Sequence, residues 1–223
     1  QFALKGAHDM SQNPLNLDIK LERTCLEMQE TGYAERWLER LVSAPTQSQI
    51  IGQLNILRSY LCKTIKPLLA DIGFVQKIYE NPVEGAPPFL IAKRLESAAL
   101  PTVLLYGHGD VIYGQEDYWH EGLYPFATTK RDGFIYGRGT ADNKGQHLIN
   151  LLALKAVLDV KSKLGFNVTL LLEMGEEIGS PGLSEFCKER KEDLDADFLL
   201  GSDGPRLMID TPTVFLGARG ALN

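Results

Sequence analysis

The sequence predicts an α/β fold in which helices are layered on both faces of a mixed, largely parallel sheet. The first 80 or so residues show helical periodicity, and short apolar runs follow them. From about residue 140 onward, helical and strand-like segments alternate, as they do in parallel sheets. With 223 residues, 44% of them apolar and 23% charged, the chain is long enough to bury a substantial core.

The N-terminal part of the chain predicts helices. Residues 18–31 and 33–43 form two expected helices separated by Gly32. A third helix is indicated by apolar residues at steps of three or four, namely Leu54, Leu57, Leu61, Ile65 and Leu68. Pro67 is expected to kink or end this helix, and Gly73 is expected to mark its stop.

The rest of the chain predicts strands and helices in turn. Apolar runs at 89–92 and 103–106 indicate buried strands, and residues 126–136 indicate a hairpin that turns at Arg131-Asp132-Gly133. The remaining expected elements are a helix at 143–160, a strand at 168–172, a helix at 182–191 and a strand at 198–200.

The composition excludes several classes of function. The formal net charge is −6 and no cluster of basic residues stands out, which argues against a nucleic-acid partner or an anionic membrane surface. No uncharged apolar run is long enough to span a bilayer. The three cysteines are far apart and odd in number, so we expect reduced thiols and a cytoplasmic protein.

Four short segments place a metal-binding or acid/base side chain beside glycine. They are residues 106–110, 136–145, 176–180 and 201–204. Three of them follow an apolar run, and ligands of open α/β sheets bind beyond the carboxyl ends of the strands. We therefore expect these four segments to converge on one site.

His108 and Asp110 are the first candidates. A single histidine after a buried strand is more often structural than metal-binding. The carboxylate two residues later favours the metal, because a metal-bound imidazole usually donates its other N–H to such a group.

Three further segments supply carboxylates. Asp142 suits a helix N-cap, and the loop before it suggests phosphate binding. That loop lacks the Gly-Lys-Ser/Thr ending, and a carboxylate there would repel phosphate but could bridge two cations. Glu176 and Glu177 could divide the roles of metal ligand and proton acceptor. Asp203 is the least specific candidate, because Ser-Asp-Gly is a common turn sequence.

Other hydrolytic motifs are missing from the sequence. His120-Glu121 begins like a zincin helix, but Tyr124 stands where its second histidine would be. Neither Gly179–Gly182 nor Gly201–Gly204 forms a nucleophile elbow. Nitrogen and oxygen ligands without cysteine suit zinc, and manganese or cobalt would also fit.

The four segments, in this order, resemble the M20 metallopeptidases. That family includes carnosinase-like dipeptidases, aminoacylases, acetylornithine deacetylase and succinyl-diaminopimelate desuccinylase. The resemblance runs from about residue 34 to the end of the chain. It implies a zinc-exopeptidase-like catalytic domain that hydrolyses amide bonds with two divalent metal ions.

The resemblance also implies a role for each site residue. His108 binds the first metal ion, which Asp203 completes, and Asp110 orients His108. Asp142 bridges both ions, with a cis peptide bond to Asn143, and Glu177 binds the second ion. Glu176 acts as the general base, taking a proton from a water held between the ions and passing it to the leaving amine.

The substrate is expected to be a small peptide. Ser202–Pro205 and Phe215–Gly220 resemble the dipeptidase branch more than the deacylases, so an N-acyl amino acid deacylase is the alternative. The resemblance further implies a homodimer for the full-length protein.

One departure from the family pattern concerns the second metal ion. It also needs a histidine near the C-terminus of a longer chain, and His8, His120 and His147 do not match that position. We therefore expect residues 15–212 to be the N-terminal part of the catalytic domain. Residues 1–14 are expected to be loosely ordered, and residues 213–223 to begin the connection into a lid or dimerisation domain.

An alternative of another class is a non-catalytic binding module with a vestigial site. The retained Glu176 argues against it, because an inactive site has no need of a base.

Overall fold

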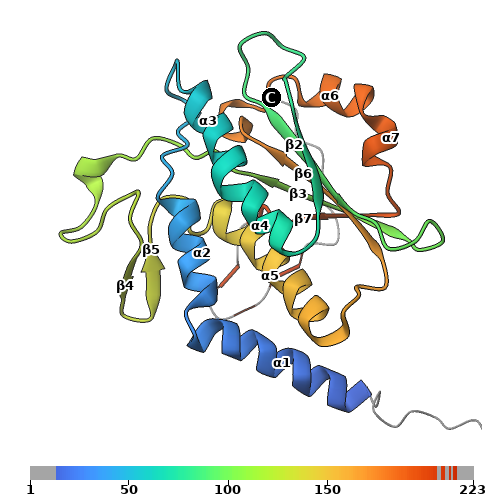
Figure 1. Ribbon diagram of the computed structural model, residues 1–223. Helices are drawn as coiled ribbons and strands as arrows, with labels where there is room; N and C mark the ends of the chain where they lie inside the picture. The colour runs from blue at the N-terminus through green and yellow to red at the C-terminus, as the bar shows by residue number, and fades with distance from the viewer. Residues whose placement is uncertain (1–13, 205–206, 209–210, 212, 215–223) are drawn as a thin grey trace, which may run out of the picture.

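A five-stranded mixed sheet forms the centre of the fold. The computed structural model describes residues 14–204, 207–208, 211 and 213–214 (Figure 1). The strands lie in the order β1 (Val75–Tyr79), β2 (Phe89–Arg94), β6 (Asn167–Glu173), β3 (Thr102–His108) and β7 (Phe198–Gly201). Strand β2 is antiparallel to β1 and β6, while β6, β3 and β7 are parallel, so β2 alone runs against the rest. The predicted fold class is confirmed.

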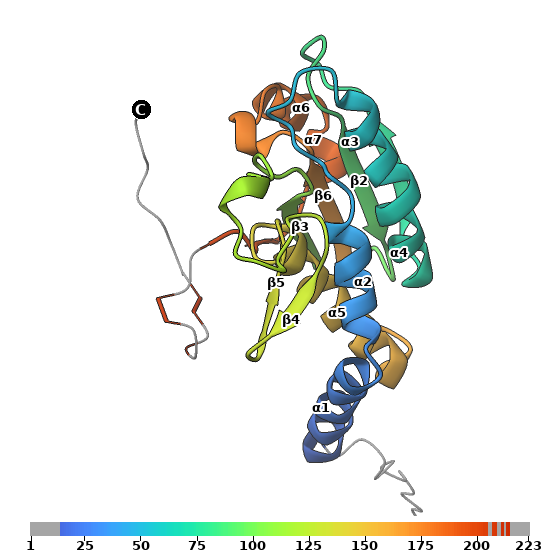
Figure 2. The ribbon, with the colours of Figure 1, turned by 90° about the vertical axis from the view of Figure 1, so that its left-hand side faces the viewer.

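Helices cover both faces of this sheet (Figures 1 and 2). One face carries α2 (Tyr33–Val42), α3 (Leu54–Tyr60), α4 (Lys66–Asp71) and α5 (Lys144–Lys161). The other carries α6 (Leu183–Glu189) and α7 (Lys191–Leu194). Helix α1 (Pro14–Glu30) packs against α2 and α5 at one end of the molecule. No helix in the described part of the chain is both long and apolar enough to cross a membrane.

Two hydrophobic cores follow from the alternation of side chains along the strands. In β2, Leu90 and Ala92 point into the core beneath α2–α5, whereas Phe89 and Ile91 point to the other face. There Phe186 of α6 stacks on Phe89 with ring centroids 4.3 Å apart. Strands β2 and β6 are thus buried on both faces along most of their length, which explains their nearly continuous apolar runs.

Three elements differ in detail from the prediction. The helix that begins at Leu54 continues past Pro67 to Asp71, with a π-helical turn over Leu61–Ile65 just before the proline, and Gly73 with a φ of 74° follows its end as expected. Proline has no N–H to donate to the previous turn, so a wider turn just before it relieves the conflict. Strand β1 is not among the expected elements, and the expected helix at 182–191 is divided into α6 and α7.

The predicted hairpin is confirmed by β4 (Thr129–Arg131) and β5 (Phe134–Tyr136). Asp132 and Gly133 form its turn with φ values of 53° and 81°. Two consecutive positive φ angles are what a tight hairpin with right-twisted strands requires.

The expectations for residues 1–14 and 213–223 fall almost wholly outside the described residues. The Phe215–Gly220 segment lies outside them entirely.

The topology brings the candidate residues to one edge of the sheet. Strands β6, β3 and β7 are parallel, so their carboxyl ends lie together. The loop that leads into α5 approaches the same edge, because the backbone N–H of His108 is bonded to the side chain of Asn143.

Gly145 should be indispensable to that loop. A Cβ at Gly145 would overlap the backbone carbonyl oxygen of Thr140, which cannot rotate away as a side chain could. We expect Gly145→Ala to lower the free energy of unfolding by about 1–3 kcal/mol, since overpacking outweighs the better helix propensity of alanine. Gly201→Ala is the matched control, because its Cβ would meet no atom within 4 Å among the described residues other than those of its chain neighbours. Equal unfolding midpoints in guanidinium for both variants would contradict this.

Candidate metal centre

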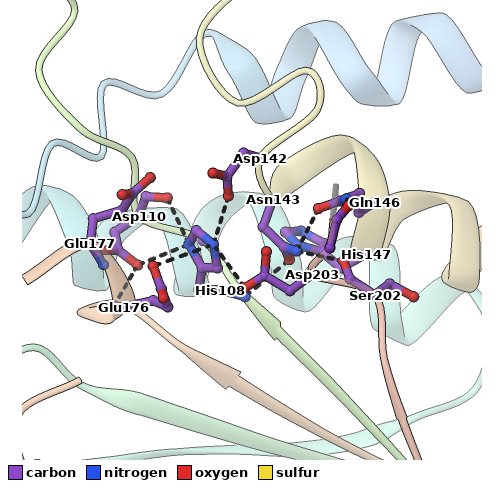
Figure 3. Close-up of polar contacts among 12 residues, drawn as sticks. His108, Asp110, Asp142, Asn143, Gln146, His147, Glu176, Glu177, Ser202 and Asp203 are labelled. Atoms are coloured by element: carbon purple, nitrogen blue, oxygen red, sulfur yellow. Dashed lines mark hydrogen bonds and ion pairs between the residues drawn. The ribbon is translucent and has the colours of Figure 1, made fainter. Parts of the chain in front are cut away.

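The imidazole of His108 lies at the centre of a cluster of carboxylates. His108 ends β3 and is fully buried. Its Nε2 atom lies 3.0 Å from Asp142 Oδ1 and 3.6 Å from Asp203 Oδ2. Glu176 Oε2 is 3.9 Å from the same nitrogen. The structure therefore brings residues from three strand ends and the α5 loop to one nitrogen atom (Figure 3).

These side chains could hold a metal ion. One ligand atom each from His108, Asp142 and Glu177 lie within 4.8 Å of one another. An imidazole nitrogen and carboxylate oxygens are a donor set that suits zinc or manganese. The cluster of like charges also favours a cation, since the carboxylates repel one another without one.

Asp110 connects His108 to the turn that carries Glu176 and Glu177. Its side chain is fully buried. Its Oδ1 accepts the backbone N–H of Glu176 at 3.2 Å, and its Oδ2 accepts that of Glu177 at 3.1 Å. Ser48 Oγ also donates to Oδ2, at 2.6 Å. One carboxylate thus fixes where the two glutamates lie relative to the end of β3.

Asp110 also determines which nitrogen of His108 faces the cluster. His108 Nδ1 lies 3.1 Å from the backbone oxygen of Asp110 and 3.4 Å from its carboxylate. A carbonyl oxygen can only accept, so Nδ1 carries a proton. In the neutral ring the Nε2 lone pair then points toward Asp142 and Asp203, as metal binding requires.

The loop that carries Asp110 is held by residues that sequence reasoning missed. Thr46 Oγ1 donates to the backbone oxygen of Gly109 at 2.6 Å, and the N–H of Val111 donates to the oxygen of Thr46 at 2.9 Å. Together with Ser48, Thr46 supports the site from the segment after α2. No signal in this Pro-Thr-Gln-Ser stretch distinguishes it from an ordinary loop.

Asn143 occupies the N-cap position of α5, the role for which the sequence makes Asp142 a candidate. The side chain of Asp142 is therefore free to face His108, and it is 68% exposed. The peptide bond between Asp142 and Asn143 is cis, as the family resemblance implies. Asn143 is fully buried, and its Oδ1 accepts the backbone N–H of His108 at 3.1 Å.

Two more buried groups lie beneath the α5 loop. Lys144 Nζ donates to the backbone oxygens of Leu41 and Ala44 at 2.8 and 2.7 Å, and burial lowers its pKa to about 7. The Nδ1 atom of His147, which is 1% exposed, lies 3.2 Å from Asn143 Oδ1. Burial lowers the pKa of His147 to about 3, so this ring is neutral.

Glu173 supports the glutamate turn from below. It ends β6, is 1% exposed, and accepts hydrogen bonds from Tyr106 Oη at 2.6 Å and Ser180 Oγ at 3.0 Å. Glu173 is not among the predicted site residues. It directly follows the apolar run at 168–172, and no motif in the sequence marks it as part of the site.

Burial and the charges of the cluster together raise the pKa values of three of its residues. Burial by itself would lower the pKa of His108, but the hydrogen bond and charge of Asp110 and the charges of Asp203 and Asp142 outweigh it and raise the pKa to about 9. Burial, aided by the charge of Asp142, raises the pKa of Glu177 to about 7. Burial also raises the pKa of Glu176. A cation that binds here therefore competes with protons for the same groups.

Comparison with known proteins decides the family. Residues 104–214 match the sequence profile of peptidase family M20/M25/M40. Beta-Ala-His dipeptidase from Rattus norvegicus is 36% identical over 153 residues, which is 67% of this chain and 30% of that protein. The chain belongs to the M20 family.

Two further proteins are similar to most of this chain. The crystal structure of human carnosine dipeptidase 1 superposes with a TM-score of 0.75 at 25% identity, covering 84% of this chain and 41% of that one. A second similar protein is the N-formyl-4-amino-5-aminomethyl-2-methylpyrimidine deformylase of Bacillus subtilis. It is 32% identical over 188 residues, which are 83% of this chain and 38% of the deformylase. The chain therefore spans about 30–40% of the length of these M20 relatives.

Metal binding to this M20 chain should release protons. A metal ion takes the neutral imidazole, whereas His108 is largely protonated at pH 8 when its pKa is about 9. The apparent zinc affinity should therefore rise with pH, by up to about tenfold per unit for one released proton, and level off above pH 9. Calorimetric titrations in buffers of different ionisation enthalpy measure this release.

A matched control is His120→Gln, because His120 is exposed and lies outside the cluster. It should leave the proton release unchanged. A zinc affinity that is the same at pH 7 and pH 9 would contradict the prediction.

Proposed function

We propose that this M20 chain carries the metal-binding and general-base residues of an enzyme that hydrolyses the amide bond of a small peptide, in the manner of a dipeptidase. The observation that carries the proposal is the placement of Glu176. Its carboxylate lies beside the candidate ligands, 3.9 Å from His108 Nε2, while the hydrogen bond to Asp110 is made by its backbone N–H and leaves the carboxylate free.

Glu176 has the properties of a general base. Its side chain is 39% exposed, so a substrate and a water molecule can reach it. Burial raises its pKa, and a base is most effective when its pKa approaches the working pH. Its neighbour Glu177, fixed by the same Asp110 carboxylate, is left to serve as a ligand.

The residues would share the work of hydrolysis as follows. His108, Asp142 and Asp203 would hold one divalent ion, and Asp142 and Glu177 would contribute to a second. Bound ions would supply a polarised amide carbonyl and a more acidic water. Glu176 would take the proton from the attacking water and deliver it to the nitrogen of the scissile amide, so that the amine departs as a neutral group.

A cleft beside the cluster supports a small substrate. It has a volume of about 840 Å³ and adjoins Asp142 and Asp203. Its other described walls include the apolar side chains of Phe134, Ile149 and Met208. A cleft of this size is typical of sites that bind small molecules.

The names of the relatives bear on the substrate. The rat and human proteins are named as dipeptidases, and the Bacillus subtilis protein as a deformylase. We therefore favour a dipeptide and retain an N-acyl amine as the second candidate. Zinc is the proposed metal, with manganese or cobalt as alternatives. We also propose a cytoplasmic location and a homodimer for the full-length protein, with residues 15–212 as the N-terminal part of its catalytic domain.

Glu176→Gln in the natural gene product should abolish most hydrolysis while metal binding persists. Loss of a general base typically costs about 10²–10⁴-fold in rate. The measurement is kcat on a dipeptide, together with the metal content of the purified variant. Glu189→Gln, which changes an exposed glutamate of α6, is the matched control and should keep full activity. Unchanged kcat in Glu176→Gln would refute the assignment.

A substrate panel separates the two candidate substrates. With zinc or manganese added, the natural gene product should cleave dipeptides with a higher kcat/KM than N-acyl amino acids. A preference for the N-acyl amino acids would support the same hydrolytic mechanism with an acylated substrate in place of a dipeptide. Absence of both activities in a metal-loaded protein would refute the proposed function.

A further inference from the structure

The loop that carries Asp203 is held by side-chain amides from one face of α5. Asn143 Nδ2 donates to the backbone oxygen of Ser202 at 2.7 Å. Gln146 Nε2 donates to the backbone oxygen of Gly204 at 3.2 Å, and Asn150 Nδ2 donates to Ser202 Oγ at 2.7 Å. The three amides, at positions i, i+3 and i+7, share one face of the helix. We call them the carboxamide face.

The first two amides are linked to each other. Asn143 Nδ2 also donates to Gln146 Oε1 at 2.9 Å, which turns the Nε2 group of Gln146 toward Gly204. On the other side, Asn143 Oδ1 accepts the backbone N–H of His108. Asn143 therefore joins the end of β3 to the Asp203 loop directly (Figure 3).

These bonds take the place of sheet pairing. Strand β7 pairs with β3 only as far as Gly201, which lies opposite Tyr106. Within the described residues, 202–204 form no ladder with another strand. Among the described residues, the side chains of α5 therefore hold the backbone on either side of Asp203. This backbone places Asp203 Oδ2 at 3.6 Å from His108 Nε2.

The glutamates are held differently. Glu176 and Glu177 depend on the carboxylate of Asp110, whereas the segment 202–204 makes its side-chain bonds to the carboxamide face. Substitutions in the carboxamide face should therefore displace Asp203 without displacing Glu176 and Glu177.

We propose that the carboxamide face of α5 positions Asp203 against His108 and thereby sets the metal affinity of that side of the centre. Gln146 and Asn150 are positioning residues that act on the metal ion through Asp203. The inference rests on the proposed function only in taking Asp203 as a metal ligand.

The test compares zinc affinities in two backgrounds of the natural gene product. Gln146→Ala and Asn150→Ala are made singly in the unaltered protein and again in Asp203→Ala. Dissociation constants come from competition with a chromophoric chelator at fixed pH. Lys161→Ala, at the exposed end of the same helix, is the control. Alanine favours the helix, so folding should persist, and apo unfolding midpoints verify it.

We expect each amide variant to weaken zinc binding by about tenfold or more in the unaltered background, the usual range for groups that orient a ligand. In the Asp203→Ala background the same changes should alter the dissociation constant less than about twofold, because the residue they act through is gone. Lys161→Ala should change neither value.

Two outcomes would overturn the inference. One is an equal loss of affinity in both backgrounds, which would mean that the amides act on stability alone. The other is no loss in either background. A protein that shows the expected affinity pattern but hydrolyses no peptide would support this inference while refuting the proposed function.

Discussion

The buried carboxylate of Asp110 is the interaction on which the candidate centre depends. A fully buried charge is costly unless it is hydrogen-bonded, and this one is bonded to the backbone N–H groups of Glu176 and Glu177 and to Ser48. It also lies 3.4 Å from His108 Nδ1. The contacts that stabilise this buried carboxylate therefore also orient the imidazole of His108 and fix the turn that carries the two glutamates. A shift of the glutamate turn would remove two of the three hydrogen bonds to this buried carboxylate.

The parallel strands make this arrangement possible. Strands β6, β3 and β7 deliver their carboxyl ends to one edge, and residues from three loops then meet around one nitrogen atom. The rest of the site is secured by polar contacts that reach across the sequence. Ser48 and Thr46 brace the loop of Asp110, Lys144 fastens the start of α5 to the end of α2, and Asn143 joins β3 to the loop after β7. The centre is thus hydrogen-bonded on its protein side, while Asp142 is exposed and Glu176 partly exposed to solvent on the other, as a site for a metal ion and a small substrate needs.

Much of the fold could be predicted from the sequence, and the failures have physical reasons. Strand β6 is buried along its whole length and shows as an unbroken apolar run, whereas β1 is a half-exposed edge strand with mixed residues. The gathering of His108 with Asp142, Glu176, Glu177 and Asp203 follows from motif order and strand direction, while their individual roles remain predictions. Ser48 could not be found, because its partner Asp110 is 62 residues away and its own segment has no distinguishing pattern. The burial of Lys144 was equally hidden, since lysine is usually exposed.

Metal binding at His108 is measured most directly by anomalous diffraction from crystals of the natural gene product grown with zinc, using data collected on both sides of the zinc absorption edge. We expect a peak about 2.0–2.2 Å from His108 Nε2 and from a carboxylate oxygen of Asp142, with Asp110 still bonded to the glutamate turn. Full zinc occupancy elsewhere, with no peak within bonding distance of His108, would contradict it.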